Sequence, residues 1–286
     1  MAESGEAGQG RVRVELGGVS ETLLWTLYHR ATEARRPDGV LRDPLAVGLL
    51  GRIDYPFEQR FGPAGSLLTQ IQGLRVRCFD REVDRFLVEH PDGTVVALGE
   101  GLETQFWRVD NGRVHWLTVD LPEVTALRDR LLPDSPRLST LACSATDERW
   151  LDEVDPTRGV LVVAQGLFMY LRPDQVHRLI AVCAGRFPGG ALVFDAVPHW
   201  FANTATRGRM RTPTGYQAPP MPWGLDVPEQ SGLRDLHPNI VGVRDLLPPP
   251  GRHLVGRILP QMNRFPLLRN RRPSVVLLSF GTELSG

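Results

Sequence analysis

The chain has 286 residues, 42% of them apolar, which suits one large α/β domain or one domain with an appended cap. Basic and acidic residues number 33 each, so the basic excess typical of a nucleic-acid-binding protein is lacking. No apolar run is long enough to span a membrane, and residues 1–10 lack the apolar core of a signal peptide, which together predict a cytoplasmic protein.

The N-terminal third is predicted to be helical after a disordered tail at residues 1–18. Ser20–Arg36 has the apolar spacing of a helix, with Ser20 as its candidate N-cap. A second, short helix is expected to begin at Asp43, since Asp43 can cap it and Pro44 suits its first position. A longer helix is expected over residues 67–86.

From residue 94 onward, apolar strands alternate with helical segments, which predicts a parallel sheet with right-handed crossovers. The helices expected between strands include residues 121–132 and 173–186. The predicted strands are residues 94–98, 114–120, 137–142, 160–164, 191–194, 241–246 and 274–280.

Two strand ends carry the strongest functional signal. The strand at 94–98 is followed by Gly99-x-Gly101, a turn at which a ligand can approach the backbone closely. The next strand ends on Asp120, and an acidic residue there can accept hydrogen bonds from both hydroxyls of a ribose. These features predict a nucleoside-containing ligand at the carboxyl ends of the strands.

The turn lacks the third glycine of the dinucleotide fingerprint, because Thr104 stands where it would fall. This disfavours NAD and FAD and favours S-adenosylmethionine, which has ribose and adenine but no pyrophosphate. A dinucleotide-dependent oxidoreductase stays open as an alternative.

Two other features are less specific. Arg75, inside the 67–86 helix, either belongs to a solvated helix face or binds a ligand carboxylate, and its position alone favours the first reading. Cys78, Cys143 and Cys183 have no metal-ligand spacing and are expected to be buried free thiols.

The long segment 198–238 breaks the alternation of strands and helices and is rich in proline and aromatic residues. It follows the fifth strand, on the side where ligands bind in open α/β sheets. We interpret it as a substrate cap. The alternative is a long connection that stabilises the fold and has no function in binding.

The residues 96–108, Val-Ala-Leu-Gly-Glu-Gly-Leu-Glu-Thr-Gln-Phe-Trp-Arg, resemble the first motif of the leucine carboxyl methyltransferase family. Within that family the chain is most similar to bacterial polyketide O-methyltransferases of the tetracenomycin type. Four further stretches agree in order and spacing: residues 43–46, 75–80, 119–124 and 165–171.

The resemblance implies a class I S-adenosylmethionine-dependent methyltransferase fold, with a Rossmann-like seven-stranded sheet, N-terminal helices and a cap insertion. It also implies roles at matching positions. Gly99 and Gly101 would approach the cofactor, Asp120 would bind its ribose, and Ser144 with Ala145 would flank its adenine. The methionine part would be held by two further residues, Arg75 at its carboxylate and Gln165 at its amino group.

The chain departs from the family at both the methionine end and the adenine end of the site. The family usually has a glutamate where Gln165 stands, and an aspartate commonly precedes the adenine-binding position where Ser144 stands. Glu100 and Glu103 are unusual for the motif and are the candidates to replace the missing charge.

Methyl transfer is an in-line displacement that needs no metal. A carboxylate acceptor is already ionised at neutral pH, whereas a phenol would benefit from a general base. The candidate bases are His29 and His199. The candidate substrate contacts are Arg30 and Arg207 for an acidic acceptor, and Trp200 and Trp223 on the cap.

The predicted function is an S-adenosylmethionine-dependent O-methyltransferase for a small carboxylate or phenol, such as a polyketide or another secondary metabolite. A weak or inactive methyltransferase-like protein that acts by binding is the other alternative. A monomer or homodimer is expected, with no membrane or nucleic-acid partner. After the tail, residues 19–286 form one domain, divided into a helical part (19–92), a cofactor-binding core (93–197), the cap (198–238) and C-terminal strands (239–286).

Overall fold

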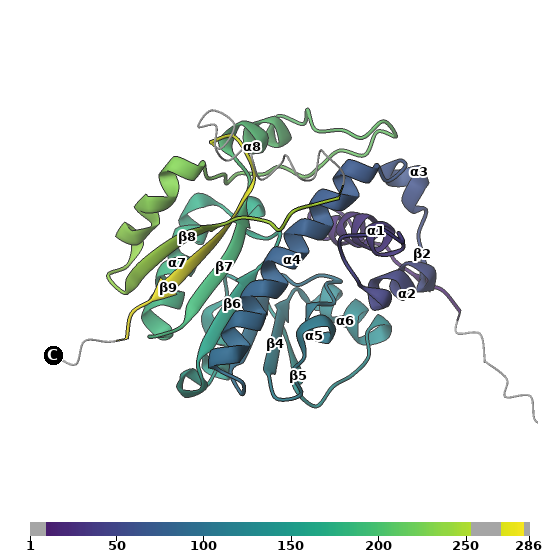
Figure 1. Ribbon diagram of the computed structural model, residues 1–286. Coiled ribbons are helices and arrows are strands. Elements are labelled where there is room, and N and C mark those ends of the chain that lie inside the picture. Colours follow the sequence, from purple (N-terminus) through teal and green to yellow (C-terminus); the bar gives the residue numbers. More distant parts are fainter. Residues whose placement is uncertain (1–9, 253–269, 283–286) are drawn as a thin grey trace, which may run out of the picture.

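A computed structural model describes residues 10–252 and 270–282 (Figure 1). Its elements, in chain order, are β1 (Val12–Arg13), α1 (Thr22–Ala34), α2 (Pro44–Arg52), β2 (Ile53–Asp54), α3 (Phe57–Phe61), α4 (Ser66–Glu89), β3 (Thr94–Leu98), α5 (Gln105–Val109), β4 (His115–Asp120), α6 (Pro122–Leu131), β5 (Leu138–Ala142), η1 (Glu148–Glu153), η2 (Pro156–Arg158), β6 (Val160–Ala164), η3 (Phe168–Tyr170), α7 (Pro173–Arg186), β7 (Ala191–Ala196), α8 (His199–Thr206), η4 (Val227–Leu236), β8 (Ile240–Leu246) and β9 (Ser274–Phe280). The η elements are 3₁₀ helices.

The seven predicted strands form one sheet, in the order β5-β4-β3-β6-β7-β9-β8. Strands β3 to β7 run parallel, whereas β9 is antiparallel to its neighbours β7 and β8. This is the class I methyltransferase sheet that the sequence predicts, with strand ends shifted by two residues at most. The chain runs outward from β3 to β5 and then restarts at β6 on the other side of β3, which places a switch point between β3 and β6.

Strand β3 shows why both faces of the sheet are covered. Val95 and Ala97 pack into one hydrophobic cluster with α4 and α5, while Val96 and Leu98 pack into another with α7 and η1. Successive side chains of a strand point to opposite faces, so a continuous apolar run needs a layer on each side. Figure 1 shows α4 crossing one face of the sheet, with α7 on the other.

The predicted helix caps have different outcomes. Asp43 caps α2 as expected, because its Oδ1 accepts the Ala46 N–H at 2.9 Å and Pro44 occupies the first position. The prediction for Ser20 is wrong. Helix α1 begins at Thr22 without a side-chain cap, and the Ser20 hydroxyl instead donates to Glu123 at 3.3 Å. A contact with another element has therefore replaced the local cap.

The N-terminal helices α1, α2 and α3 share a hydrophobic cluster with α6 and so attach to the carboxyl edge of the sheet. Part of the segment that was predicted to be disordered is structured, because β1 pairs with β2 and Val14 is buried. Residues 1–9 of the expected tail lie outside the described part. On α4, Leu74 and Cys78 are buried, whereas Ile71 is 38% exposed.

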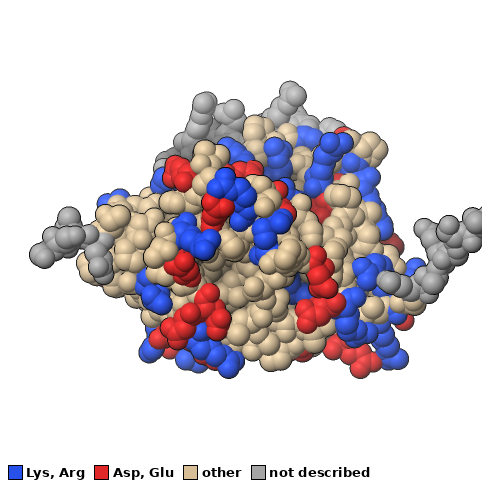
Figure 2. Space-filling view, turned by 90° about the horizontal axis from the view of Figure 1, so that it is seen from below, with Lys and Arg blue, Asp and Glu red and all other residues tan. Residues whose placement is uncertain are grey.

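The segment 198–238 contains helix α8 and the 3₁₀ helix η4, joined by an extended stretch with an isolated bridge between Arg211 and Gln217. It leaves β7 at the carboxyl edge, and Figure 1 shows it above that edge with α8. The three cysteines are free and buried, as predicted. In residues 10–252 and 270–282, no helix is long and apolar enough to cross a membrane. On the face away from α8, acidic and basic side chains are interspersed (Figure 2).

Candidate functional site

A cavity opens at the carboxyl edge of the sheet, between the ends of β3 and β6. This is the switch point of the strand order, where ligands bind in open α/β sheets. Helices α1 and α4 supply its other walls. Its lining includes seven of the residues that the sequence singled out, namely Arg30, Arg75, Gly99, Glu100, Gly101, Glu103 and Gln165.

The glycine turn brings bare backbone to the cavity wall. Gly99 and Gly101 have φ values of +60° and +56°, in the left-handed region that favours glycine. A Cβ at Gly99 would lie 2.9 Å from Leu167 Cδ1, and one at Gly101 would lie 3.0 Å from Leu23 Cβ. Both positions therefore require glycine for backbone conformation and for space.

Gly101→Ala is expected to lower the free energy of unfolding by about 1–2 kcal/mol through its left-handed φ. It should also weaken cofactor binding, because the new Cβ would push against Leu23 of the cavity wall. Gly112→Ala is the matched control, since Gly112 has φ +79° but no neighbour within 4 Å of the added Cβ. Calorimetric titration with S-adenosylhomocysteine, alongside urea unfolding, measures both effects. Wild-type affinity in Gly101→Ala would contradict a role for this turn.

Asp120 ends β4 beside the glycine turn. Its carboxylate accepts the Gly101 N–H at 2.7 Å and the Leu121 N–H at 2.8 Å, which fixes its orientation. Burial raises the pKa of Asp120, and the two backbone N–H groups oppose that rise. Asp120 adjoins the cavity rather than lining it, one hydrogen bond away from Gly101.

Arg75 reaches the cavity from α4 and is held there by a residue that the sequence reasoning missed. Its Nη1 donates to Asp195 Oδ2 at 2.7 Å, and Asp195 Oδ1 accepts the Gly166 N–H at 2.5 Å. The buried Arg75 Nε has no hydrogen-bond partner among the described residues. The signal for Asp195 was available, since it stands near the end of an apolar strand just as Asp120 does.

Gln165 follows β6 and is paired with Glu103. Gln165 Nε2 donates to Glu103 Oε2 at 3.2 Å, while the buried Gln165 Oε1 has no partner within the described ranges. The Glu103 carboxylate also accepts the Thr104 N–H at 2.9 Å. The amide oxygen of Gln165 is thus a spare buried acceptor at the cavity.

Beneath this wall lies a buried ionic network that the sequence did not predict. Arg30 Nη1 donates to Glu103 at 2.8 Å, and its Nε lies 3.0 Å from Asp43. Arg108 lies 2.8 Å from each of Asp43, Asp80 and Glu103. The guanidinium of Arg30, predicted as a substrate contact, is therefore engaged within the protein. These residues come from five separate segments, so no local spacing reveals the network.

Glu100, the other unusual carboxylate of the first motif, is engaged through one of its two oxygens, because its buried Oε1 has no hydrogen-bond partner among the described residues. Its Oε2 lies 2.8 Å from Arg128 Nη2 and accepts a hydrogen bond from the Thr118 hydroxyl. Burial raises the pKa of Glu100, although Arg128 and Thr118 oppose the rise. Glu100 and Arg128 form a one-to-one pair that adds no net charge to the cavity.

Ser144 and Ala145 lie in the loop after β5, at the same edge of the sheet. The Ser144 hydroxyl is within 2.9 Å of the Thr146 hydroxyl, and the Ala145 carbonyl accepts a hydrogen bond from Trp150 Nε1 at 3.1 Å. The loop is therefore anchored by its own residues, two strands away from the glycine turn.

Neither candidate base lines the cavity. His29 is buried in α1, where its ring packs 4.3 Å from that of Trp25 and its Nδ1 lies 2.9 Å from the Trp25 carbonyl oxygen. Burial lowers the pKa of His29, so the ring is neutral at physiological pH. His199 begins α8 at the surface, with its Nε2 2.8 Å from Glu229.

The three candidate contacts on the cap have different environments. Trp200 is 52% exposed and donates its Nε1–H to the Arg271 carbonyl at 2.9 Å. Arg207 is exposed at the end of α8. Trp223 is 4% exposed and packs edge-on against Phe168 and Phe194, which makes it a side chain of the hydrophobic core rather than of the cap surface.

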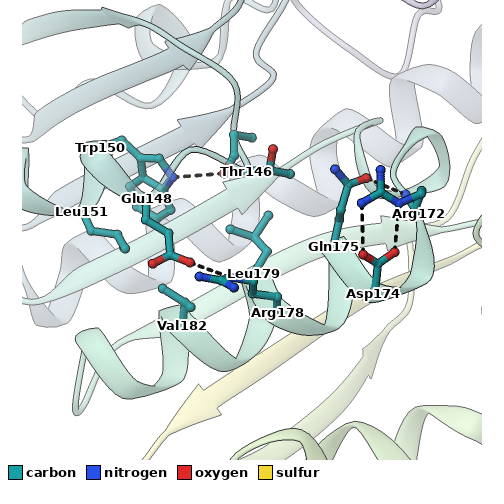
Figure 3. A pocket seen from close by; sticks show the side chains of 11 residues that line it. Thr146, Glu148, Trp150, Leu151, Arg172, Asp174, Gln175, Arg178, Leu179 and Val182 are labelled. Atoms are coloured by element: carbon teal, nitrogen blue, oxygen red, sulfur yellow. Dashed lines mark hydrogen bonds and ion pairs between the residues drawn. The ribbon is translucent and has the colours of Figure 1, made fainter.

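A second hollow, of about 310 Å³, lies between η1 and α7 (Figure 3). The arginines on it face carboxylates, as Figure 3 shows. Arg172 pairs with Asp174 at 3.1 Å and Arg178 with Glu148 at 2.7 Å. Because these charges are paired and exposed, this hollow offers less to a charged ligand than the cavity at the switch point.

The cavity has the polar groups that S-adenosylmethionine requires. The unpaired Arg75 Nε can donate to the methionine carboxylate, and the unpaired Gln165 Oε1 can accept from its ammonium group. The fixed carboxylate of Asp120 can accept from ribose hydroxyls beside the glycine turn. Without a ligand, Arg75 Nε and Gln165 Oε1 would remain buried polar atoms that lack a partner among the described residues.

Comparison with known proteins gives a consistent result. The sequence profile of leucine carboxyl methyltransferase matches residues 24–184. The tetracenomycin polyketide synthesis O-methyltransferase TcmP of Streptomyces glaucescens is 37% identical over 232 residues, covering 81% of this chain and 82% of that protein. The S-adenosyl-L-methionine-dependent methyltransferase dpfgK of Gibberella zeae is 28% identical over 254 residues, with the same two coverages.

Solved structures resemble the chain more distantly. An O-methyltransferase family protein from Burkholderia thailandensis matches 92% of this chain and 73% of its own, with 14% identity and a TM-score of 0.43. The assignment of the fold rests instead on the strand order of the chain itself.

Proposed function

The chain belongs to the leucine carboxyl methyltransferase family and is an S-adenosylmethionine-dependent methyltransferase, and from this we propose that it methylates an oxygen of a small polyketide-type acceptor. The observation that carries the proposal is the cavity at the switch point, with its unpaired Arg75 Nε and Gln165 Oε1. The 37% identity to a polyketide O-methyltransferase supports the class of acceptor.

When bound, S-adenosylmethionine supplies an electrophilic methyl group on a sulfonium centre. We propose that Arg75 holds its carboxylate, Gln165 its ammonium group and Asp120 its ribose hydroxyls. The backbone at Gly99 and Gly101 would lie against it, and the Ser144–Ala145 loop would flank the adenine. These contacts fix the direction of the methyl group, and alignment is the main contribution that such a displacement needs from the protein.

The acceptor is proposed to lie under the segment 198–238, which extends from β7 to α3. Thr214 donates to the Arg60 carbonyl at 2.8 Å, and the ring of Tyr216 packs edge-on against Phe61 at 4.8 Å. The buried Tyr216 hydroxyl has no hydrogen-bond partner in the described part of the chain, so it can bind an acceptor oxygen. Burial raises the pKa of Tyr170 to about 12. A side-chain hydrogen bond with Thr22, which lines the cavity, opposes that rise.

The placement of the histidines favours an acceptor that is ionised without help. His29 is buried beside Trp25 and His199 is paired with Glu229 at the surface, so neither is positioned as a base for a phenol in the cavity. An acceptor carboxylate or an acidic phenol needs none, because its nucleophilic oxygen already carries the charge. The three buried thiols support a reducing compartment such as the cytoplasm.

We therefore expect methyl esters, or ethers of acidic phenols, when the enzyme is incubated with S-adenosylmethionine and aromatic polyketide-type acids. With such an acceptor, kcat/KM should be constant above the acceptor's own pKa and fall below it, because only the ionised oxygen attacks. Mass spectrometry of the acceptor across pH measures this. Transfer to a nitrogen or a carbon, or only to phenols of high pKa, would overturn the proposal.

A further inference from the structure

We propose that Glu103 is a positioning residue for the cofactor, one that turns the Gln165 amide oxygen toward the ammonium group and supplies the negative charge that the amide lacks. The inference rests on the proposed placement of the methionine part of the cofactor beside Arg75 and Gln165. It goes further by assigning the charge to a carboxylate in the loop that follows β3, the strand next to β6.

The orientation of the amide follows from the chemistry of its partner. An ionised carboxylate can only accept hydrogen bonds, so Glu103 must face the NH₂ end of Gln165. Gln165 Nε2 lies 3.2 Å from Glu103 Oε2, which leaves Oε1 as the other arm of the planar amide group. That oxygen is buried and has no partner in the described ranges, so it is ready to accept from a cation.

Glu103 is held in the charged state by the network beneath the cavity. Burial alone would raise its pKa, but the guanidinium groups of Arg30 and Arg108 outweigh burial and lower the pKa to about 2. The carboxylate is only 7% exposed, so water screens its charge weakly.

The network also carries an unbalanced charge. Arg30 and Arg108 contact three carboxylates, those of Asp43, Asp80 and Glu103, so two positive charges meet three negative ones. The other charged side chains lining the cavity, Arg75 and Glu100, are each paired with a partner of opposite charge, Asp195 and Arg128. The network as a whole therefore carries surplus negative charge, and Glu103 is its carboxylate that lines the cavity.

This arrangement predicts an unusual response at position 165. A glutamate there would by itself attract the ammonium group more strongly than glutamine does. In this chain, however, its carboxylate would lie against that of Glu103, and two adjacent carboxylates cannot both ionise freely. Gln165→Glu should therefore weaken cofactor binding unless Glu103 is neutralised at the same time.

The test is calorimetric titration of four full-length proteins, namely the wild type, Glu103→Gln, Gln165→Glu and the double variant. S-adenosylhomocysteine is the first probe, and 5′-methylthioadenosine, which lacks the amino-acid part, is the second. For S-adenosylhomocysteine, each single variant should bind about tenfold more weakly, the effect of one charge-assisted hydrogen bond, and the double variant should return to within about threefold of the wild type. Affinity for 5′-methylthioadenosine should stay within about twofold in all four.

Other outcomes separate the possible errors. Tighter binding by Gln165→Glu alone, or additive losses in the double variant, would overturn the role of Glu103. A wild type that binds both probes equally would overturn the placement of the methionine part itself. Retained affinity for 5′-methylthioadenosine certifies that a variant is folded. If Glu103→Gln fails to fold, the comparison of Gln165→Glu with the wild type still decides the proposal.

Discussion

Asp120→Ala is expected to weaken S-adenosylhomocysteine binding by about 100-fold or more while the protein remains folded. Two charge-assisted hydrogen bonds to the ribose hydroxyls would be lost, each worth about 1.5–3 kcal/mol. The substitution also removes the acceptor for the Gly101 N–H, and so loosens the glycine turn. Calorimetric titration measures the affinity, and circular dichroism confirms the fold.

Two further variants test whether the loss of affinity in Asp120→Ala comes from the removed carboxylate itself. Asp120→Asn keeps one oxygen for the Leu121 N–H and removes the charge, so it should lose less affinity than alanine does. Glu123→Gln is the matched control, because it neutralises an exposed carboxylate in the next turn of chain and should leave affinity within about twofold. Unchanged binding by Asp120→Ala would contradict the placement of the ribose.

The proposed binding of the ribose by Asp120 should make cofactor affinity depend on pH. Burial raises the pKa of Asp120 above its usual 3.8, and the proposed hydrogen bonds from the ribose hydroxyls require the ionised form. Cofactor affinity should therefore be full at neutral pH and fall as the pH decreases through the raised pKa. Asp120→Asn should lack that part of the pH dependence.

Arg108→Met is expected to cause the largest loss of stability, about 3–5 kcal/mol in the free energy of unfolding. Arg108 is half of the positive charge in the network, and without it Asp43, Asp80 and Glu103 would share Arg30 alone. Desolvated carboxylates without a partner are costly, whereas methionine replaces only the volume of the arginine. Urea unfolding measures the loss.

Arg113→Met is the control for Arg108→Met, since Arg113 pairs with Asp92 at the surface, where the side chains are 57% and 52% exposed. An exposed pair of this kind contributes about 0–1 kcal/mol. Equal losses in the two variants would contradict a special role for the buried network.

The network should also appear in the pH dependence of stability. Arg30 and Arg108 lower the pKa of Glu103 to about 2 in the folded protein, against an ordinary value of 4.5 for a solvated glutamate. The resulting stability is present above pH 4.5 and is lost as the pH falls through the folded-state pKa. In Arg108→Met this acid-dependent loss should shrink, because less of the pKa shift remains.

The sheet could be predicted from the sequence because its signal is local. Continuous apolar runs such as residues 94–98 and 160–164 can be buried on both faces only in a parallel sheet with helices on each side. Asp43 was also correctly predicted as a cap, since its partner lies three residues away. Ser20 was not, because its hydroxyl binds Glu123, which is distant in the sequence.

The site was predictable only as far as strand ends define it. Gly99 and Asp120 each follow or end an apolar strand, so spacing was enough to bring them together. Asp195 and Glu103 have their roles through Arg75 and Gln165, partners that only the folded chain brings within reach. Trp223 was predicted to be a substrate contact on the cap because it stands in a proline-rich segment, but its side chain is buried in the hydrophobic core.

The most direct test of the central assignment is a crystal structure of the enzyme with S-adenosylhomocysteine. The ribose hydroxyls should lie within hydrogen-bond distance of Asp120, the carboxylate on Arg75 and the amino group on Gln165 Oε1. S-adenosylhomocysteine bound without contacts to Asp120, Arg75 and Gln165 would contradict it.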